Sequence, residues 1–115
     1  MSTTLERQDI KKGVYLFAVH GDLDAAGGLA VKDEFESYVA ENPARCIVDL
    51  SDVSYMSSYG LRVLLSVAKI LQQGGGELHL AAPTQRVMDV LATSGYNTLF
   101  PVHDTLDKAK STLGA

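Results

Sequence analysis

Apolar and polar positions along the chain follow two periods, which predict strands and helices in turn. Residues 13–21 (GVYLFAVHG) are rich in β-branched and aromatic residues and bounded by glycines, which is typical of a strand. Residues 5–10 form a weaker candidate strand before it. Further on, apolar residues at positions 31, 35, 38 and 39 recur with helical spacing until Asn42 and Pro43. The short apolar run CIVDL (46–50) predicts a central strand covered on both faces.

The second half of the chain continues this alternation. The predicted elements are a helix from Ser58 to Gln73 that stops at the glycines 74–76, a strand over 77–82, a helix over 84–94 that ends at Gly95, a short strand over 99–102 and a final helix that begins at Asp104 as its N-cap. Strands that alternate with helices from the second strand onward indicate parallel pairing. We therefore expect an α/β fold, with a central, mostly parallel sheet of about five strands and about four helices.

The helix that begins at the two adjacent serines is apolar over most of its circumference. Its polar residues Arg62, Ser66, Lys69 and Gln73 fall within a band roughly 60° wide on a helical wheel. Extended backward, this band leads to Ser58, with Tyr59 on its flank. Capping by Ser58 would alone account for a serine there. A helix N-terminus also stabilises anions, so a phosphate on Ser58 would add about −1.5 to −2 charges without straining the fold.

Composition narrows the classes of protein that this chain can belong to. With 115 residues, the chain is long enough for one domain, residues 1–115, with a substantial core. A net charge of −4, a pI near 5.2 and scattered basic residues argue against binding to nucleic acid or to an anionic membrane. The single Cys46 excludes a disulfide within one chain and is expected to be a buried hydrophobic residue. No signal-peptide pattern or membrane-length apolar stretch is present, so we expect a cytoplasmic protein.

Catalytic and metal chemistry find little support in the sequence. His20, His79 and His103 fall on different predicted elements without a short ligand spacing, so we expect neither a metal site nor a cofactor. The sequence SSYG lacks the first glycine of a G-x-S-x-G nucleophile elbow, and no enzymatic activity is expected. A receiver-like domain, in which Asp49 or Asp52 accepts a phosphoryl group with Mg²⁺, stays open as an alternative, although the acidic pair and the late Lys-Pro expected of it are missing.

Several segments, in their order and spacing, resemble the STAS domain family and, within it, the stand-alone bacterial anti-sigma factor antagonists. They are GDLD (21–24), IVDLSDVSYMSSYGLRVLL (47–65), GGGELHLAAP (74–83) and LATSGYNTLFPV (91–102). The resemblance implies a STAS-like fold. It places Ser58 at the position of the family's phosphoacceptor serine, followed by the family's Gly-Leu pair at Gly60 and Leu61.

The resemblance also implies a function in partner switching. The unphosphorylated protein would bind an anti-sigma factor serine kinase with a histidine-kinase-like ATPase fold, which frees the sigma factor for transcription. Phosphorylation of Ser58 by that kinase would end binding, and a PP2C-type serine phosphatase would restore it. A STAS scaffold that is never phosphorylated, within a larger signalling or transport assembly, stays open as a second interpretation.

The chain departs from the family pattern on both sides of Ser58. Ser57 stands where the family usually has Asp, which makes Ser57 a candidate second acceptor, and Tyr59 replaces a small hydroxyl residue. Asp22 and Asp24 match an acidic loop that resembles a partner-contact region, while a turn followed by a helix cap accounts for them equally well. The predicted partner-binding residues are Asp22, Asp24, Ser57, Ser58, Tyr59 and Arg62.

Overall fold

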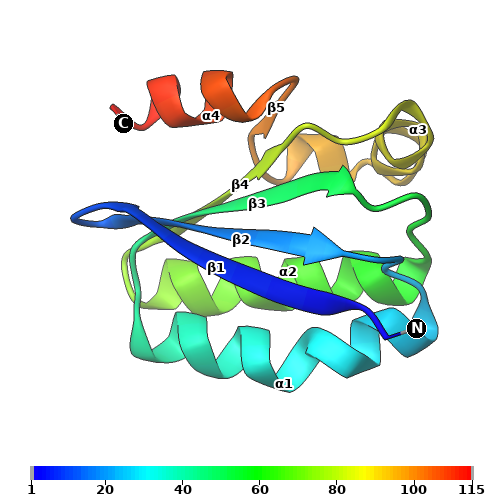
Figure 1. Cartoon of the computed structure of the whole chain (residues 1–115), viewed down its shortest axis with the longest axis horizontal. Coiled ribbons are helices and arrows are strands. Elements are labelled where there is room, and N and C mark those ends of the chain that lie inside the picture. The colour runs from blue at the N-terminus through cyan, green and yellow to red at the C-terminus, as the bar shows by residue number, and fades with distance from the viewer. Residues whose placement is uncertain (1, 115) are drawn as a thin grey trace.

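The computed structural model describes residues 2–114, whose strands and helices alternate as the sequence predicts (Figure 1). The elements are β1 (Thr4–Lys11), β2 (Val14–His20), α1 (Ala25–Glu41), β3 (Arg45–Asp52), α2 (Ser58–Gln73), β4 (Glu77–Ala81), α3 (Gln85–Ser94), the 3₁₀ turn η1 (Tyr96–Thr98), β5 (Val102–His103) and α4 (Leu106–Thr112). The predicted α/β class is confirmed. The weak first strand is real and longer than expected.

The five strands form one sheet in the order β1-β2-β3-β4-β5. β1 and β2 are antiparallel neighbours joined by a tight turn, in which Gly13 has a φ of 82° that favours glycine. All later neighbours are parallel, and a helix lies in each connection between them. The mostly parallel sheet is therefore confirmed, and the carboxyl ends of β2 and β3 lie at the same edge of the sheet.

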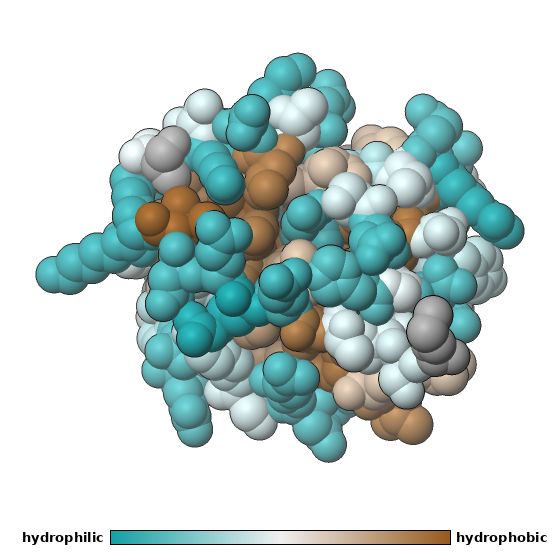
Figure 2. Space-filling model, viewed as in Figure 1, coloured by the Kyte–Doolittle hydropathy of each residue, from teal (hydrophilic) through white to brown (hydrophobic). Residues whose placement is uncertain are grey.

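The two faces of the sheet are covered unequally. In Figure 1, α1 and α2 lie side by side below the sheet and α4 lies above it. The larger core contains the aromatic side chains of Tyr15, Phe17 and Phe35, together with apolar residues of α2 and α3. α4 covers only part of the other face, through a small apolar cluster that includes Ala109 and Leu113. Figure 2 accordingly shows a mostly hydrophilic surface, with hydrophobic residues gathered near α4.

Two predicted boundaries near the C-terminus are wrong. The last strand comprises Val102–His103 rather than residues 99–102, because the chain turns through η1 and leaves the Leu99 side chain half exposed. The final helix begins at Leu106 and is capped by Thr105, whose Oγ1 accepts the backbone N–H of Lys108 at 3.1 Å. Asp104 lies one residue before the cap. Within residues 2–114, no helix has both the length and the apolar character needed to cross a bilayer.

Candidate functional site

Two loops meet where α2 begins: the β2–α1 loop (residues 21–24) and the β3–α2 loop (residues 53–57). Because β2 and β3 are parallel neighbours, both loops leave the same edge of the sheet, and their backbones stay in contact beyond it. The contacts are hydrogen bonds from Gly21 N–H to Asp52 O (3.3 Å), from Leu23 N–H to Tyr55 O (3.0 Å) and from Ser57 N–H to Leu23 O (2.9 Å). These bonds fix the position of the serines.

Ser57, not Ser58, is the N-cap of α2. Its Oγ accepts the backbone N–H of Gly60 at 3.3 Å and lies 3.4 Å from the carbonyl oxygen of Leu23, to which it donates. Ser57 has the extended backbone that is typical of an N-cap, and its own N–H donates to the carbonyl oxygen of Leu23, outside the helix. Ser58 is therefore the first helical residue, and it is exposed. The prediction that Ser58 caps the helix is wrong by one position.

Gly60 allows the first turn of α2 to press against the β2–α1 loop. A Cβ atom at this position would lie 2.1 Å from the carbonyl oxygen of Leu23, which belongs to the backbone and cannot move aside cheaply. The Gly-Leu pair seen in the sequence thus has a packing role. Gly60 permits the close approach, and the next side chain, Leu61, is buried.

Tyr59 and Arg62 form the flank of the site that faces α1. The ring of Tyr59 packs on Gly28 of α1, where a Cβ atom would lie 2.8 Å from Cδ2 of the ring. The guanidinium of the exposed Arg62 lies 5.8 Å from the centroid of the Tyr59 ring, in cation–π range. Arg62 therefore turns back toward Tyr59, in the first turn of α2.

The polar stripe of α2 is only partly exposed to solvent. Ser66 Oγ donates to Oε2 of Glu36 on α1 at 2.6 Å, and Nζ of Lys32 lies 3.0 Å from Oε1 of the same carboxylate. The hydroxyl of Ser66, followed by Lys32, lowers the pKa of Glu36. The middle of the stripe thus joins α1 to α2, while Ser58 and Arg62 at its N-terminal end, like Lys69 and Gln73 at its C-terminal end, are exposed.

The predicted acidic loop lies beside the serines, and its two carboxylates differ in role. Oδ1 of Asp24 accepts the N–H of Gly27 at 2.7 Å and caps α1, as the helix-cap alternative expects. The carbonyl oxygen of Asp22 accepts the hydroxyl of Thr3 at 2.6 Å. Asp22 also lines two surface hollows of about 220 and 520 Å³.

An open, mostly apolar groove of about 390 Å³ lies next to Ser58, between α2 and α3. It is lined by Ser58, Leu61, Asp89, Val90, Thr93 and Ser94. The predicted residues Asp22, Asp24, Ser57, Ser58, Tyr59 and Arg62 thus gather around one end of the molecule. The groove was not predicted, because its α3 side becomes adjacent only through tertiary packing.

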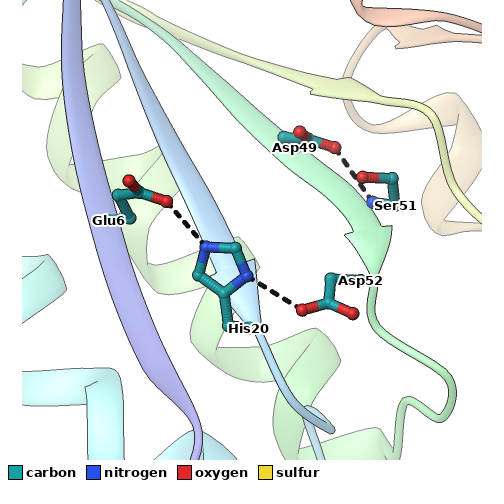
Figure 3. Close-up of polar contacts among 5 residues, drawn as sticks. All are labelled: Glu6, His20, Asp49, Ser51 and Asp52. Carbon is teal, nitrogen blue, oxygen red and sulfur yellow. Dashed lines mark hydrogen bonds and ion pairs between the residues drawn. The ribbon is translucent and has the colours of Figure 1, made fainter.

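A charged cluster at the base of the two loops was also missed. His20, at the end of β2, lies between Glu6 of β1 and Asp52 of β3 (Figure 3). Its Nδ1 is 2.9 Å from Oδ2 of Asp52 and its Nε2 is 2.8 Å from Oε1 of Glu6. These hydrogen bonds, first that to Asp52 and then that to Glu6, raise the pKa of His20. In the sequence, His20 carries no signal beyond that of a possible metal ligand.

The other two histidines meet in space. Nδ1 of His79 lies 2.9 Å from Nε2 of His103, and the two rings are stacked. Burial and the neighbouring His79 lower the pKa of His103. A separation of 24 residues gives no sequence signal for this contact, which depends on the pairing of β4 with β5. In the part of the chain that the structure describes, no three His, Cys, Asp or Glu side chains group as a metal site.

Comparison with known proteins agrees with this architecture. A family model for the STAS domain matches residues 7–109, so the chain belongs to the STAS domain family. It is 33% identical over 109 residues to BtrV of Bordetella bronchiseptica, a protein that is named as an anti-sigma factor antagonist. The match covers 95% of this chain and 91% of BtrV. The anti-sigma-B factor antagonist of Listeria monocytogenes is 31% identical over 84 residues, covering 73% of this chain and 74% of the relative.

Among solved structures, an anti-sigma factor antagonist from Mycobacterium paratuberculosis is similar, with a TM-score of 0.86 and 26% identity. That superposition covers 98% of this chain and 95% of the other. The two relatives described here are thus anti-sigma factor antagonists by name, and the solved structure has the same fold.

Proposed function

We propose that this protein is an anti-sigma factor antagonist that works by partner switching. When unphosphorylated it binds an anti-sigma factor serine kinase of the histidine-kinase-like ATPase fold, and phosphorylation of Ser58 releases it. A PP2C-type phosphatase reverses the modification. The protein is then a ligand and a substrate rather than an enzyme, and it acts in the cytoplasm. The main support is that Ser57 serves as the helix cap, which leaves the exposed Ser58 free of that structural role.

A phosphate on Ser58 is compatible with the fold. Ser58 occupies the first helical position, where backbone N–H groups and the helix dipole favour negative charge. Arg62 lies four residues later on the same helix face, with its guanidinium 5.8 Å from the ring centroid of Tyr59, the residue next to Ser58. We therefore expect the phosphorylated domain to be about as stable as the unmodified one, so that only docking changes.

The same phosphate would change the docking surface strongly. Ser58 borders the apolar groove, whose other wall includes Asp89 and Val90 of α3. A partner that inserts an apolar side chain there gains from burial. A dianion at the rim would have to be desolvated, and it would repel any acidic group of the partner. The other docking residues in this proposal are Asp22, Asp24, Ser57, Tyr59 and Arg62.

The direct test incubates the protein with ATP and the histidine-kinase-fold serine kinases encoded near its gene, and maps any added phosphate by intact-mass and fragment measurements. The proposal expects one phosphate, on Ser58. The Ser58→Ala variant should not be phosphorylated and should bind the kinase constitutively. The matched variant Ser57→Ala should still be phosphorylated. Modification of Ser57 alone would contradict the assignment.

Binding measurements provide a second test. Ser58→Asp should weaken affinity for the cognate kinase while the melting temperature stays nearly constant, because the added anion sits at a favourable helix end. Unchanged affinity would count against the proposal. The two alternatives have their own outcomes: an alkali-labile acyl phosphate on Asp49 or Asp52 would indicate a receiver-like reaction, and no phosphate at all a scaffold. Asp49 accepts the Ser51 N–H at 2.9 Å and Asp52 pairs with His20, so both carboxylates already have partners.

A further inference from the structure

His20 occupies a position that neither a cap nor the core explains. Both of its ring nitrogens face carboxylate oxygens at hydrogen-bond distance, one from Glu6 and one from Asp52 (Figure 3). Carboxylates accept hydrogen bonds and do not donate them when ionised. Both contacts are satisfied together only if each ring nitrogen carries a proton, that is, by the imidazolium form.

We propose that His20 is a positioning residue for the docking surface around Ser58, and that its imidazolium ties β1 to β3 and makes docking depend on pH. We call the contact set Glu6–His20–Asp52 the histidine clip. The effect on docking rests on the function proposed above, whereas the clip itself does not.

The clip lies where the regular ladder between β2 and β3 is interrupted. Pairing runs in register up to Ala18 and Asp49, then shifts, so that His20 pairs with Asp52. Immediately beyond it, the carbonyl oxygen of Asp52 accepts the N–H of Gly21 at a long 3.3 Å. A side-chain tie at this point therefore reinforces a weak part of the backbone pairing.

From the clip, the backbone contacts continue to the serines. After Asp52 and Gly21 come the two loops, which are joined at Leu23 and Tyr55 and again at Leu23 and Ser57. Loss of the clip would weaken the first contact of this series, the hydrogen bond from Gly21 to Asp52. The cap residue Ser57 and the exposed Ser58 lie at its far end.

Among the residues that the structure describes, the charged groups that contact His20 or line the two hollows beside it are acidic. Glu6 and Asp52 hold the ring, while Asp49 and Asp22 line the two hollows that flank it. α4 contributes only the uncharged Leu106 to these hollows. The surroundings therefore favour the imidazolium and raise the pKa of His20.

The direction of the pH effect follows from this raised pKa. The clip is complete at mildly acidic pH, where His20 is protonated and both carboxylates are ionised, and it is lost as the pH rises through the pKa of His20 in the folded protein. One nitrogen then presents a lone pair to a carboxylate, and that contact becomes repulsive. Docking should weaken over the same pH range, in which His20 loses its proton.

The test combines imidazole NMR with binding, using the whole chain. In the free protein, the His20 ring should titrate above the ordinary histidine value, and Glu6→Gln should lower its pKa. The amide signals of Leu23 and Ser57 should follow the same titration, and in His20→Asn they should not. A His20 ring that titrates at or below the ordinary value, or independently of Glu6→Gln, would overturn the clip.

Kinase affinity is then measured against pH for the wild type and His20→Asn, so that the ratio of the two cancels the kinase's own titration. We expect this ratio to change by about two- to fivefold across the His20 titration, as suits an exposed charge pair. A constant ratio, with the ring titrating as expected, would overturn the positioning role. If no kinase binds at any pH, the proposed function fails, and the amide titration alone decides whether His20 positions the loops.

Discussion

Substitutions of the two adjacent serines should differ in their effect on the free energy of unfolding, because only Ser57 caps the helix. Ser57→Ala removes the acceptor for the Gly60 N–H and the weaker contact with Leu23. The loss of a serine cap costs about 1 kcal/mol, within a range of about 0.5–2. The long 3.3 Å bond gives no reason to expect the upper end of that range. For 115 residues, the entropy of unfolding converts this cost into a decrease in Tm of about 4 °C.

Ser58→Ala is the matched control, since it removes the same hydroxyl from an exposed first-turn position. It should change stability by less than about 0.5 kcal/mol. Thermal unfolding followed by circular dichroism, together with urea unfolding, measures both variants under one set of conditions. Equal losses, or a larger loss at Ser58, would refute the cap assignment. Such a result would also remove the main reason for treating Ser58 as the free acceptor.

Three further predictions follow from local geometry. Gly60→Ala places Cβ against the carbonyl oxygen of Leu23 and should destabilise the fold by about 1–3 kcal/mol in urea unfolding; an unchanged midpoint would disprove the close contact. Burial raises the pKa of the Cys46 thiol, so it should resist iodoacetamide at pH 8 until urea unfolds the chain; rapid native labelling would contradict this. The pKa of Glu36 is lowered in the folded protein, so its ionised carboxylate stabilises the fold above the pKa of the unfolded state, and this stabilisation is lost as the pH falls. Glu36→Gln should therefore destabilise the fold more at pH 7 than at pH 3. Equal losses at the two pH values would argue against the hydrogen bond from Ser66.

Hydrophobic periodicity predicts most of the fold because most elements bury a continuous face. α2 is the clearest case: its many apolar positions are covered by the sheet and by α1, and its bounds are as expected. Leu99 shows the limit of this reasoning. It is apolar and follows a predicted helix, yet the chain turns there and leaves it half exposed. Composition cannot distinguish a short edge strand from such a turn.

The sequence predicted residues that the fold brings close together, but it did not predict their local structural roles. Two neighbouring serines are equally good caps by propensity, and the choice between them depends on a hydrogen bond from Ser57 to Leu23, 34 residues earlier. The histidine clip and the groove depend likewise on contacts between distant elements. Sequence motifs can therefore indicate which residues gather, whereas only tertiary contacts show that Ser57, and not Ser58, caps the helix.

The departure from the family pattern at Tyr59 shows how the fold accommodates a large side chain beside Ser58, the proposed acceptor. A large ring at this position could have blocked Ser58, but it packs on Gly28, where α1 has no Cβ atom. The space for the ring is thus provided by α1, not by the β2–α1 and β3–α2 loops. Ser58 stays exposed, and Arg62 gains an aromatic face that keeps its guanidinium near the first turn. Under the proposed function, a partner would meet a bulky, cationic flank where the family pattern has a small hydroxyl residue, so we expect the change to affect partner choice while Ser58 stays accessible.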